Sequence, residues 1–179
     1  MNELVIETNL EDLEADFKKA NSIDNIRSAE ELAQLYCSFN SKAFEKVRCR
    51  FRTCFDHLWV KFHYKGHEYD LINETNWVLE YVSVWILSVE NKHPVKEPLT
   101  FDVKVLSLGW DKLKDLFLQK NLKDVAKECF AISSLMKFFI PEYERYLTAV
   151  KKVKEKCFDE STNTWHLERR KRNEIRSEN

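Results

Sequence analysis

The chain has 179 residues, of which 44% are hydrophobic and 33% charged, and its net charge is −1. This length suits one domain with a sizeable apolar core, and the near-neutral charge excludes a field that would draw the whole domain to nucleic acid or to an anionic membrane. Only two glycines and three prolines are present. Because phosphate-binding loops and nucleophile elbows depend on glycine, this scarcity favours a helical interaction protein over an enzyme.

Apolar residues recur at steps of three and four along most of the chain, which is the spacing of one face of a helix. Asn9 is expected to cap a first helix, and Ser28 with Glu31 forms the S-x-x-E pattern of a helix start. Four stripes follow, at 44–62, 71–89, 99–117 and 122–139, and Pro141 suits the first turn of a last helix. The sequence therefore predicts a mainly α fold, either an antiparallel multi-helix bundle or a short helical-repeat array.

Some stretches also fit a strand. Between residues 57 and 72, Val60, Phe62 and Tyr64 alternate ahead of the pair Lys65-Gly66, which is typical of a β-hairpin. Residues 100–108 alternate as well, and residues 81–89 are rich in β-branched side chains. We expect helix in these stretches, with a small β-hairpin near 58–72 as the alternative. Residues 1–158 should form a single helical domain, followed by a polar, basic C-terminal tail at 159–179.

One helix pair is predicted in more detail. Residues 110–133 have the sequence WDKLKDLFLQKNLKDVAKECFAIS. The key positions of the first helix are Trp110, Leu113 and Phe117, and those of the second helix are Ala126, Phe130 and Ser133. This run resembles a single tetratricopeptide-type helix pair, with Asn121 in place of the usual turn glycine and Lys114 in place of a usual small residue. The resemblance implies that Ala126 allows close helix approach and that Phe130 fills the gap between the helices. An ordinary antiparallel pair inside a bundle is the alternative.

Cysteine and histidine gather in one short stretch. Cys49, Cys54, His57, His63 and His67 lie within nineteen residues, which superficially suits zinc, but only eight residues separate the Cys pair from the last two histidines. The apolar stripe explains Cys54 by burial, and all five cysteines fall in helical patterns rather than strained turns. We therefore expect no metal, no cofactor and no catalytic residue.

The helix predicted at 71–89 carries more aromatic area than one buried face absorbs. Trp77, Tyr81 and Trp85 are our candidate partner-binding residues, because large exposed apolar patches usually have a partner. A central helix buried on all sides is the alternative interpretation. The first hypothesis is accordingly a non-enzymatic adaptor or complex subunit that binds another protein or peptide, or a second copy of itself.

Basic clusters at 42–52 and 151–172 support a second hypothesis, a nucleic-acid-associated protein. The candidate contacts are Arg48, Arg50, Arg52, Arg169, Arg170, Lys171 and Arg172. The run ERRKRNEI, residues 168–175, resembles the basic segment of helix-loop-helix DNA-binding proteins and also fits a nuclear-localisation signal. The cysteines are scattered and form no CxxC pair, which predicts a reducing compartment, the cytoplasm or the nucleus. No apolar run is long enough to span a bilayer, so we expect no membrane partner.

Overall fold

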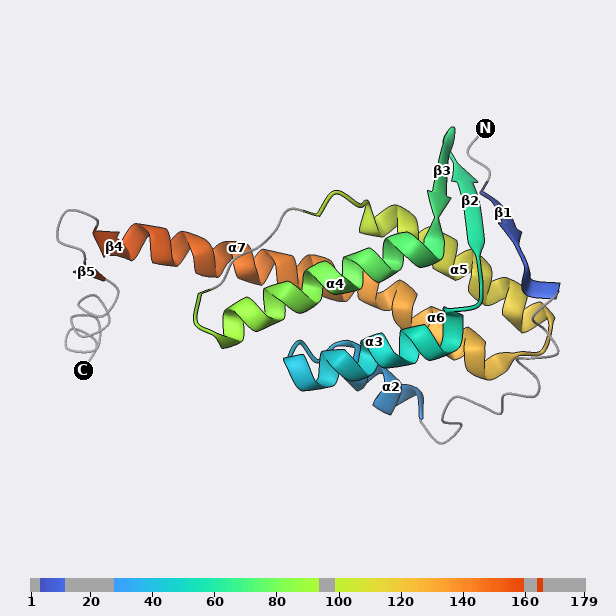
Figure 1. Ribbon diagram of the computed structural model, residues 1–179, viewed down its shortest axis with the longest axis horizontal. Helices are drawn as coiled ribbons and strands as arrows, with labels where there is room; N and C mark the ends of the chain where they lie inside the picture. The colour runs from blue at the N-terminus through green and yellow to red at the C-terminus, as the bar shows by residue number, and fades with distance from the viewer. Residues whose placement is uncertain (1–3, 12–27, 94–98, 160–163, 166–179) are drawn as a thin grey trace.

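The structure, a computed structural model, describes residues 4–11, 28–93, 99–159 and 164–165 (Figure 1). It is mainly helical with a small antiparallel sheet, as the sequence predicts. The helices are α2 (Ala29–Tyr36), α3 (Ser41–Phe55), α4 (Leu71–Glu90), α5 (Val103–Gln119), α6 (Lys123–Ser134) and α7 (Ile140–Cys157). The strands are β1 (Val5–Thr8), β2 (Val60–Tyr64) and β3 (His67–Asp70), with a separate short pair, β4 (Phe158–Asp159) and β5 (Thr164–Trp165).

Four of the helices begin where a side chain accepts a hydrogen bond from the first turn, as helix N-termini require. Ser28 caps α2 by accepting from the Glu31 amide at 3.1 Å, as the S-x-x-E pattern predicts. Asn40 does the same for α3, from Ala43 at 2.9 Å. Asp70 and Asp102 cap α4 and α5. In a chain with only two glycines, polar N-cap residues therefore mark where these helices begin.

The core forms around Trp110 of α5, which is fully buried. Its ring lies edge-on to Phe55 at 4.8 Å and to Phe51 at 6.0 Å between centroids, both on α3. Its indole N–H donates to the Thr75 hydroxyl of α4 at 2.9 Å, so the one polar atom of the ring is satisfied. Three helices thus meet at this side chain.

The helix expected between residues 57 and 70 is wrong, and the alternative hairpin is confirmed. Strands β2 and β3 pair antiparallel, and Lys65 and Gly66 connect them with φ of 49° and 79°. Two consecutive positive φ angles define the type I′ turn that matches strand twist. Helix α3 therefore stops at Phe55, and Phe62, the last member of that stripe, reaches the core from a strand instead. Helix is confirmed at 81–89 and at 103–108, whereas residues 99–102, where helix was also expected, precede α5 and are not helical.

A third strand, β1, pairs with β2 and was not predicted. Asn9, at the end of β1, holds it in place: its amide donates to the His57 carbonyl at 3.2 Å and its oxygen accepts from the Trp59 amide at 3.0 Å. The sequence predicts that Asn9 caps a first helix. Leu10 and Glu11, directly after it, are helical, and the remainder of that expected helix lies outside the described residues. The Asn9 side chain ties β1 to the chain that leads into β2.

Helices α6 and α7 are joined without a break by a π-helical turn, Leu135–Phe139, in which Ile140 donates to the Leu135 carbonyl. Pro141 follows at the second position of α7, as predicted for a first turn. Because proline has no N–H and its ring crowds the carbonyl four residues earlier, a wider turn just before it lets the helix continue. Such turns often mark functional sites.

Candidate interaction groove

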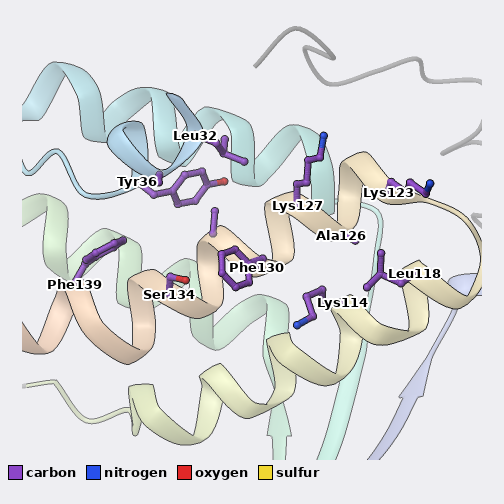
Figure 2. A pocket seen from close by; sticks show the side chains of 12 residues that line it. Leu32, Tyr36, Lys114, Leu118, Lys123, Ala126, Lys127, Phe130, Ser134 and Phe139 are labelled. Carbon is purple, nitrogen blue, oxygen red and sulfur yellow. The ribbon is translucent and has the colours of Figure 1, made fainter. Parts of the chain in front are cut away.

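An apolar hollow runs along α6, with α2 on one side and α5 on the other (Figure 2). We call it the α6 groove; its volume is about 530 Å³. Twelve residues line it: Leu32, Ala33, Tyr36, Lys114, Leu118, Lys123, Ala126, Lys127, Phe130, Ala131, Ser134 and Phe139. Small residues on α2 and α6, namely Ala33, Ala126, Ala131 and Ser134, keep the space between the walls unfilled.

Two large apolar side chains stand exposed in the groove. Phe130 has 60% and Leu118 48% of its surface accessible, and both line the same apolar hollow, so they form a contiguous exposed apolar surface of the kind that marks interaction sites. Burial of Phe130 between paired helices, which the tetratricopeptide resemblance implied, is therefore wrong. The pair itself exists as α5 and α6, and Asn121 in the turn has φ of 63°. Phe130 lies on the exposed side of α6, beside Lys114 of α5, because Ala126, Cys129 and Ile132 form the buried face of α6.

Lysines are the only charged residues that line the groove. Lys114 Nζ lies 5.7 Å from the centroid of the Phe130 ring, within cation–π range. Its nearest carboxylate is Asp115 at 3.9 Å, and Lys127 has Asp124 at 3.9 Å. Exposed ion pairs at this distance contribute little free energy, so these ammonium groups are readily shared with another anion.

A buried polar network lies beneath the groove and joins α2, one of its walls, to α6, its floor. Tyr36 of α2 donates its hydroxyl to one carboxylate oxygen of Glu128 on α6 at 2.6 Å. Arg50 of α3 binds the other oxygen. Burial, and then the negative charge of Glu128, raise the pKa of Tyr36 well above its usual value. Both carboxylate oxygens are thus occupied, and the network connects three helices.

The two thiols nearest this network are held protonated. Burial, with the Glu128 carboxylate, raises the pKa of Cys54, and burial raises the pKa of Cys129 well above its usual value. Thiols act as nucleophiles only as thiolates. Burial therefore keeps both thiols in the protonated form, which is a poor nucleophile.

Of the three α4 aromatic residues predicted to bind a partner, one is buried in the structure and two reach the surface. Trp85 is fully buried, so its assignment to a partner-binding surface is wrong: it lies on the core face with Val78 and Val82. Trp77 is 51% exposed, and Tyr81 is partly exposed. Both contact Phe101, at 5.7 and 6.3 Å between ring centroids. The structure therefore brings Trp77 and Tyr81 together, with a residue that the sequence did not single out.

The basic cluster on α3 does not form one face. Arg50 points inward to Glu128, so its assignment as an exposed nucleic-acid contact is wrong. Arg48 binds the Ser83 hydroxyl of α4 at 3.4 Å, and Arg52 pairs with Glu45 at 3.3 Å. The four basic residues at 169–172 lie outside the described residues.

The cysteines and histidines considered for zinc are not brought together. Cys54 is buried, Cys49 is exposed on α3, and His63 on β2 lies nearest to Glu7 and Glu68, at 3.7 and 3.8 Å. Across the described ranges, no three His, Cys, Asp or Glu side chains are placed to hold a metal ion.

Sequence reasoning missed the groove. Glu128 carried a signal: it falls within the apolar series Val125, Ala126, Cys129 and Ile132, and a charge within a buried stripe indicates a partner from another helix. Phe130 and Leu118 carried none, because each fits a helical pattern whether it faces the core or solvent.

Fold and site together define a mainly helical protein with a small antiparallel sheet and an open apolar groove bordered by lysines. Comparison with family models, with curated proteins and with solved structures gave no significant match to this chain. In the part of the chain that the structure describes, no helix has the length and apolar character needed to cross a membrane.

Proposed function

We propose that this chain is a non-enzymatic protein-interaction subunit and that the α6 groove receives its partner. One observation carries the proposal: exposed Phe130 and Leu118 project into an apolar hollow of about 530 Å³. Aromatic side chains in such hollows are typical anchors of protein interfaces. Burial of a phenylalanine side chain by a partner stabilises a complex by roughly 1.5–3 kcal/mol.

The groove is suited to binding because it is preformed. The bonds from Tyr36 and Arg50 to Glu128 hold α2 and α3 against α6. A site held in its binding shape loses less conformational entropy when the partner arrives. The network beneath the groove therefore supports affinity without touching the partner.

Site-specific photo-crosslinking tests this function. A photoreactive phenylalanine replaces Phe130 in one sample and Trp59, a 49% exposed aromatic beside the sheet, in the other. A crosslinked partner should form from position 130 and not from position 59. Equal crosslinking from both positions, or none from position 130, would contradict the proposal.

The Trp77–Tyr81 surface is a second candidate contact, for another protein or a second copy of this chain. It is favoured by a shallow hollow in which Trp77, Tyr81 and Val84 of α4 lie beside Phe101. Trp77→Ala and Tyr81→Ala should weaken association, measured by analytical ultracentrifugation, with little change in stability. A large loss of stability would instead assign both side chains to the core.

A further inference from the structure

We propose that the partner of the α6 groove is an amphipathic helix with acidic residues at one end. This inference rests on the proposed function and adds the chemistry of the partner. It follows from three properties of the groove: its length, its apolar surface and the position of its lysines.

The length fits a short helix. The α6 residues that line the groove run from Lys123 to Ser134, which spans roughly 17 Å at 1.5 Å per residue, or about three helical turns. The groove lies between α2 and α5 (Figure 2), and Phe130 and Leu118 within it are exposed. A helix that lies in such a groove inserts side chains at i, i+3 or i+4, and i+7.

The surface selects apolar side chains. Nine of the twelve lining residues are not charged, and Tyr36 and Ser134 are the polar ones among them. The hydroxyl of Tyr36 is committed to Glu128. A partner therefore meets mainly aliphatic and aromatic carbon, above all Phe130 and Leu118, which suits leucine-like side chains better than phosphates.

The charge is asymmetric. Figure 2 shows Lys123, Lys127 and Lys114 toward the end of the groove near the turn between α5 and α6, and Ser134 and Phe139 toward the other end. No carboxylate lines the groove, and the acidic residues Asp115 and Asp124 are exposed neighbours of the lysines at 3.9 Å. Carboxylates on one end of a bound helix complement this positive end and set the direction of binding.

The experiment measures fluorescence anisotropy of a labelled, designed 14-residue helix mixed with the full chain. The helix carries leucine at i, i+3, i+4 and i+7 and glutamate on both flanks of its first half. One control peptide replaces each glutamate with lysine, and a second replaces each leucine with serine. We expect binding of the acidic peptide that weakens with added salt, and at least about tenfold weaker binding of both controls.

Charge-reversed protein variants locate the binding. The double variant Lys123→Glu/Lys127→Glu should raise the Kd at least about tenfold, whereas Lys152→Glu, at an exposed lysine of α7 that does not line the groove, should change it less than about twofold. Circular dichroism of each variant checks that the helices persist. Because Lys123, Lys127 and Lys152 are all exposed, loss of fold is not expected.

Several outcomes overturn the inference. Equal binding of the lysine peptide would exclude recognition of acidic residues, and equal loss of binding in Lys152→Glu would place the peptide elsewhere. Binding of palmitate but of no peptide would assign the groove to a lipid, and preferential binding of a peptide with the sequence of residues 10–27 would assign it to a segment of this chain. If no helix binds while crosslinking from position 130 still captures a partner, the proposed function stands and the helical, acidic partner is wrong.

Discussion

Tyr36 of α2 donates its phenolic hydrogen to Glu128 of α6 at 2.6 Å, and this buried bond joins one wall of the α6 groove to its floor. Arg50 binds the same carboxylate from α3. One acidic side chain thus joins α6 to two helices that lie 92 and 78 residues earlier in the sequence at the bonded positions, and its removal should affect the whole fold.

Replacement of Glu128 by alanine should strongly destabilise the protein. The change leaves the Arg50 guanidinium, which is mostly buried, without its carboxylate, and breaking a buried pair from one side costs about 3–5 kcal/mol. Urea denaturation followed by circular dichroism measures the free energy of unfolding. Asp115→Ala removes an exposed carboxylate on α5 and should change it by less than about 0.5 kcal/mol. Similar losses for the two variants would contradict a stabilising network.

Tyr36→Phe should make the protein less sensitive to alkaline pH. The folded pKa of Tyr36 is raised by burial and by Glu128, so above the unfolded value of about 10 only the unfolded chain releases this proton. Stability therefore falls as pH rises through that range, by up to about 1.4 kcal/mol per pH unit for one proton. Tyr143, whose pKa burial raises to about 12, adds to the fall in both proteins.

Urea midpoints at pH 8 and pH 10.5 compare the two proteins. At pH 8 the variant should be less stable by about 1–3 kcal/mol, because Glu128 loses a hydrogen bond. The difference should shrink at pH 10.5. A difference that grows with pH would mean that the folded pKa of Tyr36 is not raised.

Gly109→Ala should destabilise the protein although alanine favours helix. Gly109 lies within α5, and an added Cβ would come 2.9 Å from Cε1 of Phe62, a buried side chain of β2. Overpacking costs about 1–3 kcal/mol, against a gain of about 1 kcal/mol in helix propensity. We expect a net loss of about 1 kcal/mol in thermal or urea denaturation.

The matched background is Phe62→Leu, which removes the ring that the new Cβ meets. In that background the loss caused by Gly109→Ala should be smaller, because the helix propensity gain remains and Leu71 Cδ1, 3.1 Å from the new Cβ, is the close contact that is left. An identical loss in both backgrounds would show that α5 is not limited by its contact with β2.

Changes in the β2–β3 turn should have opposite signs. Lys65 and Gly66 both have positive φ, and asparagine followed by glycine is the preferred pair in a type I′ turn. Lys65→Asn should therefore raise the midpoint of thermal denaturation slightly. Gly66→Ala should lower stability by about 1–2 kcal/mol, because a side chain disfavours this conformation, even though no atom lies within 4 Å of the new Cβ. A neutral Gly66→Ala would contradict the turn.

Much of the helical fold followed from local pattern. The stripes at 71–89, 99–117 and 122–139 correspond to α4, α5 and α6 with its π turn, and Ser28 caps α2 as predicted. These features depend on neighbours within a few residues along the chain, so periodicity and capping chemistry were sufficient to predict them. The aromatic content of α4 predicted three exposed residues, Trp77, Tyr81 and Trp85; Trp77 is exposed and Tyr81 partly exposed, whereas Trp85 is buried.

Only tertiary structure decided which residues share each environment. Strand β1 exists because β2 pairs with it, Trp85 is buried because other elements cover its face of α4, and Arg50 points inward because Glu128 of α6 lies opposite. Phe130 is exposed because α2 and α5 stand apart where α6 carries alanines. A periodic stripe specifies that a face is apolar but not which element packs on it. Among the described residues, no element covers Phe130 on α6, and this exposed face forms the α6 groove.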